Sequence, residues 1–203
     1  VAGRDQEAQC LALRCLTHLV ATNAQARDCV FAALARKEKN VWYAAAWALE
    51  HVGPAGAPAM PVLLKRLDDE EAVWPVARAL KSIGSPGALP ALPTLMRLFT
   101  QGSDNVEHWY EVRDAIAALG PDAIGPLLDT APGTTGDAFA DLVGALTDIG
   151  PSAVPALKKA AKHKDATTRQ AVKEALARLS PEAGADLLRS SDPDEVARTL
   201  DHP

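Results

Sequence analysis

The chain has 203 residues, of which 48% are hydrophobic, 23% charged and 4% aromatic. This hydrophobic fraction excludes a disordered chain, and the formal net charge of −5 argues against a primary nucleic-acid binder, which needs a basic surface. No apolar run approaches the roughly 18 residues of a membrane-spanning helix, so we expect no membrane association. Cys10, Cys15 and Cys29 are odd in number and lack metal-ligand spacing, which predicts free thiols and a cytoplasmic location.

A six-residue pattern recurs along the chain: Ala, an aliphatic residue, two variable residues, a second aliphatic residue and Gly. Clear copies begin at Ala48, Ala79, Ala115 and Ala145, and degenerate copies begin at Cys15 and Ala175. The copies end at positions 20, 53, 84, 120, 150 and 180, which are 33, 31, 36, 30 and 30 residues apart. Such regular spacing of helix-forming segments predicts a helical repeat array.

The predicted elements alternate between a shorter first helix and a longer second helix. The chain opens with a second helix at 5–19, and each later second helix ends at a repeated pattern, where Gly can adopt a left-handed conformation. We expect first helices at 57–67, 88–99, 123–130, 153–161 and 182–189. The expected N-terminal caps are Asn23, Asn40, Asp165, a capping box from Asp104 to Glu107, and the Ser-Pro or Asp-Pro pairs at 85–86, 180–181 and 192–193.

Numbering from the repeated Ala as position 0, apolar residues also occupy positions −3, +1 and +4. This spacing forms one stripe along an amphipathic helix, so the stripe is the predicted buried face of each second helix. In the first copy of the pattern, this stripe predicts that Ala12 and Cys15 are buried. The resulting fold is all-α, with helix pairs that bury their faces against neighbouring pairs.

Segments 41–54 and 168–181 resemble HEAT repeats, and the short unit is most similar to the HEAT-like repeats of the phycobilisome-lyase type. The resemblance implies a single HEAT-like domain over 1–203, a right-handed α-solenoid of about six stacked antiparallel helix pairs, with second helices lining the concave face. HEAT repeats often carry Arg at position −6, and here only Arg169 matches. Since neither end resembles a polar cap, we expect a fragment of a longer protein.

Large aromatic residues gather in two neighbouring columns of the second helices. Position −5 lies opposite the buried stripe and carries Tyr43, Trp74 and Tyr110, which we therefore expect to face solvent. Position −6 lies on the flank and carries Trp42, Trp109 and Phe139, which either extend this strip or pack against neighbouring repeats.

Exposed aromatic clusters with charged neighbours are typical of recognition surfaces. We predict a binding surface for a protein or peptide, made by Tyr43, Trp47, Trp74, Arg78, Trp109, Tyr110 and Asp114. The acidic run at 68–71 is interpreted as stabilising a helix N-terminus. His18 and His51 share a column and are interpreted as solvated helix-end residues, with a weak metal site that includes Glu50 as the alternative.

The leading hypothesis is a non-catalytic scaffold without a cofactor or a metal, because no phosphate loop, nucleophile elbow or metalloprotease motif occurs. Two alternatives stay open. The resemblance includes bilin lyases and DNA-base glycosylases, and the glycosylase alternative would use Trp109, Tyr110 and Asp114. The chain could also be a structural spacer or oligomerisation segment; we expect a monomer or weak self-association.

Overall fold

A computed structural model describes residues 2–102 and 106–180 of the chain. The described residues form α-helices and short 3-10 helices and contain no strand, which confirms an all-α fold of stacked helix pairs. Within them, no helix has both the length and the apolar character needed to cross a membrane. The predicted helix at 182–189, Asp104, and the Pro residues of the 180–181 and 192–193 pairs lie outside the described residues. The chain divides into two compact units, residues 1–122 and 123–203.

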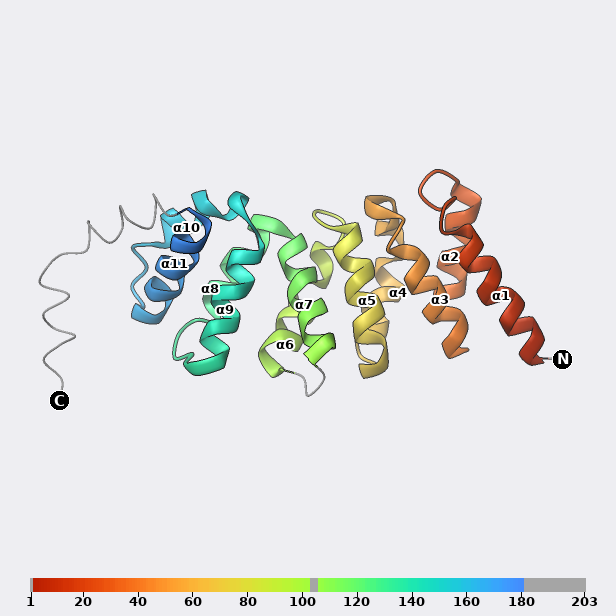
Figure 1. Ribbon diagram of the computed structural model, residues 1–203, viewed down its shortest axis with the longest axis horizontal. Helices are drawn as coiled ribbons and strands as arrows, with labels where there is room; N and C mark the ends of the chain where they lie inside the picture. Colours follow the sequence, from red (N-terminus) through yellow and green to blue (C-terminus); the bar gives the residue numbers. More distant parts are fainter. Residues whose placement is uncertain (1, 103–105, 181–203) are drawn as a thin grey trace, which may run out of the picture. The chain divides into compact units, whose positions relative to one another are not determined.

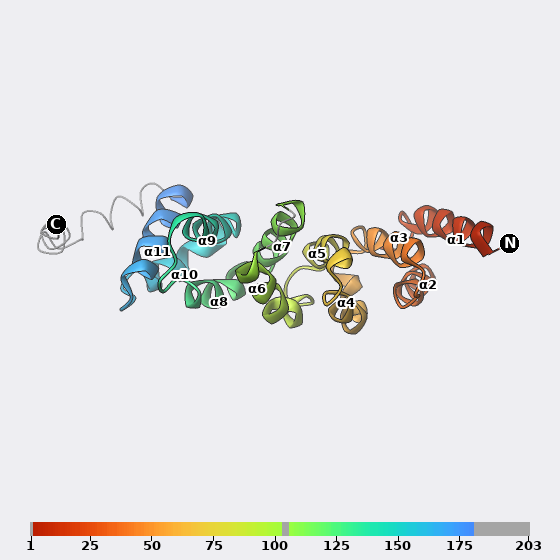
Figure 2. The same ribbon diagram turned by 90° about the horizontal axis from the view of Figure 1, so that it is seen from below.

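Unit 1, residues 1–122, consists of two layers of helices (Figures 1 and 2). One layer contains the second helices, and the other contains the first helices. The second helices are α1 (Ala2–Leu16), α3 (Lys39–Leu49), α5 (Glu70–Ile83) and α7 (Val106–Ala118). The first helices are α2 (Ala24–Leu34), α4 (Met60–Arg66) and α6 (Leu92–Gln101), the last two preceded by 3-10 turns at Gly53–Ala59 and Leu89–Ala91.

Unit 2 repeats the same plan. Its first helices are α8 (Ile124–Asp129) and α10 (Val154–Ala160), preceded by 3-10 turns at Gly120–Ala123 and Pro151–Ala153. Its second helices, α9 (Gly136–Asp148) and α11 (Ala166–Leu179), pack against each other. The expected first helices at 57–67, 88–99, 123–130 and 153–161 are therefore present, each with a 3-10 first turn.

The buried face has the predicted register in five second helices. The repeated Ala is fully buried in each of α3, α5, α7, α9 and α11. Positions −3, +1 and +4 are buried as well, except that Leu179 at the end of α11 is half-buried. Because Ala has only a methyl group, the adjacent helices approach closely at this position, and the larger residues at +1 and +4 fill the space on either side.

The predicted register of α1 is wrong by one residue. Ala12 and Cys15 are exposed, whereas Leu13, Thr17 and Val20 are buried. The stripe therefore runs through Leu13, Leu16, Thr17 and Val20, with Leu16 at the position of the repeated Ala. The polar Thr17 interrupts the apolar pattern, and it is accommodated because its Oγ1 donates a 2.7 Å hydrogen bond to the backbone carbonyl of Arg14.

The predicted helix ends are partly confirmed. The side chains of Asn23 and Asp165 cap α2 and α11 by accepting hydrogen bonds from the backbone amides of Ala26 and Thr168. Asn40 is not a cap, because α3 already begins at Lys39. Each Gly that ends a clear copy of the pattern has a left-handed φ of +62° to +80°, as predicted for a helix stop; these are Gly53, Gly84, Gly120 and Gly150.

Two further cap predictions have opposite outcomes. The Ser85–Pro86 pair does not start a helix, since the following 3-10 turn begins at Leu89. The residues between Ser85 and Leu89 form a turn instead. In this turn Gly87 packs tightly on Ile83, since a Cβ atom added to Gly87 would lie 2.9 Å from Ile83 Cγ2. The acidic run does stabilise a helix start, because the Asp69 side chain accepts a 3.2 Å hydrogen bond from the Glu71 amide at the N-terminus of α5.

Candidate functional site

All seven predicted binding residues lie in unit 1, on three successive second helices. Positions −5 and −1 are one helical turn apart, so their side chains project from the same side of each helix. We call this surface the α3–α5–α7 face. It is defined by Tyr43 and Trp47 on α3, Trp74 and Arg78 on α5, and Trp109, Tyr110 and Asp114 on α7.

The rings of the −5 column are less exposed than the helical pattern predicts. Tyr43 and Trp74 are half-buried because they stack on each other, with ring centroids 5.9 Å apart and planes at 21°. This burial raises the pKa of the Tyr43 hydroxyl. Only Tyr110 has the predicted solvent exposure among these three rings, at 48% of its surface.

The rings of the −6 column in unit 1 pack against neighbouring helices. Trp42 is 3% exposed and lies under the guanidinium of Arg66, at 4.8 Å from the ring centroid. Trp109 is half-buried and stacks on Phe99 of α6, with centroids 5.5 Å apart. Of the two interpretations of this column, packing against neighbours describes both rings.

Arginine side chains lie over the rings of the face. The Arg78 guanidinium carbon is 5.1 Å from the Trp74 centroid, and that of Arg113 is 4.9 Å from Tyr110 and 5.3 Å from Trp109. Cation–π contacts of this kind hold both the charge and the ring in fixed orientations. The face therefore presents rings whose positions are set before any ligand arrives.

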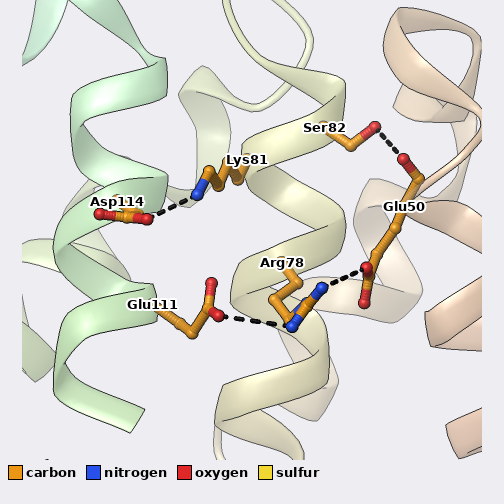
Figure 3. A network of polar contacts seen from close by, with 6 residues as sticks. All are labelled: Glu50, Arg78, Lys81, Ser82, Glu111 and Asp114. Carbon is orange, nitrogen blue, oxygen red and sulfur yellow. Dashed lines mark hydrogen bonds and ion pairs between the residues drawn. The ribbon is translucent and has the colours of Figure 1, made fainter. Parts of the chain in front are cut away.

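A line of ion pairs connects α3, α5 and α7 beside the rings (Figure 3). Arg78 of α5 lies between two carboxylates: its Nη2 is 2.9 Å from Glu50 Oε2, and its Nη1 is 3.6 Å from Glu111 Oε1. Burial raises the pKa of the Glu111 carboxyl, and the attraction of Arg78 only partly opposes this rise. The hydrogen bond with Glu50 raises the pKa of Arg78, which stays fully charged.

Two further polar contacts support this line. Lys81 Nζ is 2.5 Å from Asp114 Oδ2, and Ser82 Oγ donates a 2.7 Å hydrogen bond to the backbone carbonyl of Glu50 (Figure 3). Arg78 and Asp114 are thus placed on the predicted face, but both are engaged with side chains of the neighbouring repeat. The sequence analysis missed Glu111. Its signal was an opposite charge 33 residues after Arg78, which is one 36-residue repeat less about one helical turn.

A groove between α1 and α3 adjoins the ring surface. It has a volume of about 490 Å³, and we call it the α1–α3 groove. Its lining residues are Cys10, Arg14, Lys39, Asn40, Tyr43, Ala44 and Trp47. Cys10 is half-buried here, and its thiol donates to the backbone carbonyl of Asn40, with the two atoms 3.3 Å apart. This groove was not predicted from the sequence, because α1 forms one of its walls and the predicted register of α1 is wrong by one residue.

The histidine column does not assemble a site. His18 and His51 are both exposed, and the His51 ring lies against Trp47 with centroids 5.3 Å apart. In the part of the chain that the structure describes, no three His, Cys, Asp or Glu side chains are placed to hold a metal ion.

Comparison with known proteins identifies the fold without identifying a family. No protein-family model matches the chain, and no curated protein matches it. The crystal structure of an engineered protein is similar, with a TM-score of 0.53 and 22% identity, covering 88% of this chain and 92% of that one. A second engineered protein has a TM-score of 0.52 and 22% identity, covering 93% of this chain and 62% of that one.

A third similar structure is a computationally designed armadillo repeat protein for modular peptide recognition. It has a TM-score of 0.46 and 18% identity, and the match covers 83% of this chain and 92% of that one, a similarity too low to support any inference about this chain. The two better matches agree with the helix order and packing described above. This chain is a helical repeat protein.

Proposed function

We propose that this chain is a non-catalytic, HEAT-like scaffold that binds a peptide or an extended protein segment across the α3–α5–α7 face. Tyr43 and Trp74 stack on each other, and Tyr110, in the same column of the next repeat, is 48% exposed; these rings are the main support for the proposal. These rings come from three successive repeats, so their spacing follows the repeat and suits an elongated ligand.

The rings are suited to binding because they combine a large apolar area with little freedom to move. Tyr43 and Trp74 hold each other by stacking, and Arg78 and Arg113 fix the outer rings by cation–π contacts. A ligand that covers them removes apolar surface from water without ordering flexible side chains, which reduces the entropic cost of association. Aromatic residues with this environment are frequent among binding hot spots.

The charges on the face favour a peptide over a nucleic acid. Arg78 and Lys81 are each paired with carboxylates, so phosphate groups would have to displace Glu50, Glu111 or Asp114. The net charge of −5 adds a general repulsion. Paired charges that border rings instead form a polar rim, such as surrounds the apolar centre of protein interfaces.

The glycosylase alternative has less support than the scaffold. It needs an aromatic ring free to stack on a base and an acidic residue free to act, but Trp109 stacks on Phe99 and Asp114 is paired with Lys81. We therefore keep Tyr110 in a binding role and propose no catalytic residue. The spacer alternative predicts that the face binds nothing, and the following experiment separates it from the scaffold.

The proposal is tested by selecting ligands from a displayed library of random dodecapeptides, with the full chain immobilised. We expect the chain to enrich a related set of sequences. The triple variant Tyr43→Leu, Trp74→Leu and Tyr110→Ala should lose binding to them by tenfold or more, since truncating hot-spot residues costs about 2 kcal/mol or more. Leucine is chosen at the two half-buried positions to preserve packing.

A matched control separates binding from folding. Leu11→Ala also removes an exposed apolar side chain, 61% exposed on α1, but lies outside the groove lining and the face. It should bind the selected peptides like the parent chain. Helical circular dichroism and melting temperature are recorded for all variants. A library that yields no common sequence, or a folded triple variant that retains full affinity, would overturn the proposal.

A further inference from the structure

The α1–α3 groove combines an apolar lining with positive charge. Tyr43, Ala44 and Trp47 line it from α3 with apolar groups, whereas Arg14 and Lys39 contribute basic groups. None of the described residues that line it is acidic. In this respect the groove differs from the crevice between α3, α5 and α7, where Glu50 and Glu111 accompany Arg78 and Lys81.

The positive charges of the groove are available to a ligand. The described residues include no carboxylate paired with Arg14, whose guanidinium carbon lies 5.8 Å from the centroid of Trp47. Lys39 Nζ is 2.6 Å from Glu71, but both side chains are more than half exposed, at 57% and 64%. A pair this exposed contributes little and exchanges readily with solvent or a ligand.

The rings of Tyr43 and Trp47 and the guanidinium of Arg14 together determine which kind of ligand fits the groove. A bulky apolar side chain that lies against Tyr43 and Trp47 would exclude water from their apolar surface. A carboxylate beside it would reach Arg14, whose planar guanidinium can donate two parallel hydrogen bonds to one carboxylate. Exclusion of water by the apolar side chain would in turn strengthen the charge pairing.

We infer that the α1–α3 groove anchors the bound peptide by taking a large apolar side chain followed directly by an acidic residue. This inference rests on the proposed function and names the partner's chemistry: an aromatic or large aliphatic residue followed directly by an acidic one. The anchor lies at one end of the α3–α5–α7 face, since Tyr43 lines the groove and also stacks on Trp74. The rest of the peptide then continues over the later repeats.

The cysteines provide a test that reports on the groove alone. Cys10 lines the groove and is half-buried, whereas Cys15 and Cys29 are exposed and lie outside it. Trypsin cleaves after Arg4, Arg14, Arg27 and Arg36, so each cysteine falls on its own fragment. The rate of alkylation by iodoacetamide can therefore be measured separately at each thiol by mass spectrometry.

The probe is the peptide Gly-Ser-Phe-Glu-Ser-Gly, acetylated at its N-terminus and amidated at its C-terminus so that only the Glu carries charge. At saturating probe we expect alkylation of Cys10 to slow at least threefold, with no change at Cys15 and Cys29. Three further peptides, with Phe-Gln, Ala-Glu or Phe-Lys in place of Phe-Glu, should each protect Cys10 weakly or not at all.

Affinity for a fluorescent form of the probe tests the charge contact by anisotropy. Arg14→Gln should weaken binding about fivefold or more, which corresponds to roughly 1 kcal/mol for one contact with a charged group. Arg178→Gln is the matched control, because it removes an exposed basic side chain from α11 in unit 2. It should leave the affinity unchanged.

The outcomes separate this inference from the proposed function. Equal protection of Cys10 by Phe-Glu and Phe-Gln, or equal slowing of all three thiols, overturns the anchor. Library peptides that bind the ring face, lack an apolar–acidic pair and leave Cys10 reactive overturn the anchor while the scaffold function stands. A library without enriched sequences removes the scaffold function, and the anchor with it.

Discussion

Arg78 forms contacts with carboxylates of both neighbouring repeats. Its guanidinium bonds to Glu50 of the preceding second helix, approaches Glu111 of the following one, and covers Trp74 of its own helix. The helical pattern placed Arg78 on the correct face, but it could not supply these partners. Pairing depends on the distance between helices one repeat apart, which a single-helix wheel does not contain.

Removing the charge of Arg78 should destabilise the fold. In Arg78→Met the stem still packs on Trp74, but Glu50, only 13% exposed, loses its partner. Because a largely buried carboxylate without a partner is costly, we expect the free energy of unfolding, obtained from urea titrations, to fall by about 1–3 kcal/mol. Adding Glu50→Gln should recover part of the loss.

Lys39→Gln is the comparison for that experiment, because it breaks an ion pair that is exposed on both sides. It should change the free energy of unfolding by less than about 1 kcal/mol. If Arg78→Met is as harmless as Lys39→Gln, the line of ion pairs does not stabilise the contact between α3 and α5.

Glu111 should make stability depend on pH. Burial raises the pKa of its carboxyl, so between the ordinary and the raised pKa the folded chain binds more protons than the unfolded chain. Stability therefore falls as pH rises through that window. Glu111→Gln should melt at a higher temperature than the parent at pH 7, and the difference should shrink as the pH falls below the ordinary pKa of Glu, where both states become protonated. A difference independent of pH would contradict this account.

At the scale of the helices, the repeated pattern predicted the buried face correctly wherever apolar residues occupied every position of the stripe. In α3, α5, α7 and α9 it identified each residue of the buried stripe. It failed in α1, where the buried Thr17 interrupts the apolar spacing and Cys15 imitates the repeated Ala. Helix starts were harder to predict than helix ends, because Gly at the ends has a backbone requirement that other residues meet only with strain.

Two glycines of unit 2 should respond in opposite ways to substitution by Ala. Gly125 precedes Pro126 in α8, and apart from its chain neighbours and the backbone of its own helix no atom lies within 4 Å of an added Cβ, whereas Gly150 has a φ of +80° after α9. Gly125→Ala should stabilise the chain by about 0.5–1 kcal/mol because it improves helix propensity. Gly150→Ala should destabilise it by about 1 kcal/mol because a Cβ disfavours left-handed backbone.

Thermal and urea unfolding of the two variants measure this difference. If Gly150→Ala is neutral, the turn after α9 does not need its left-handed residue, and the account of Gly as the helix stop in each repeat is wrong.

At the scale of the whole molecule, the rings of the −5 column are confined to unit 1. The same column carries Ala140 and Gln170 in unit 2, so the repeat continues there without the aromatic surface. The buried columns therefore repeat with the packing, whereas the exposed columns differ between repeats, as we propose for columns that serve binding. The columns could be predicted from the sequence. The stacking of Tyr43 on Trp74, and hence their partial burial, could not, because it depends on the distance between α3 and α5.

We propose that a peptide binds across the α3–α5–α7 face, on the outer rings of its second helices. The four indole N–H groups report on it directly, as separate peaks in a ¹⁵N spectrum assigned by single Trp→Phe variants. On addition of a library-selected peptide, the peaks of Trp47 and Trp74 should shift, while that of Trp42, 3% exposed beneath Arg66, should not. A peptide that binds without moving Trp47 and Trp74 would contradict the claim.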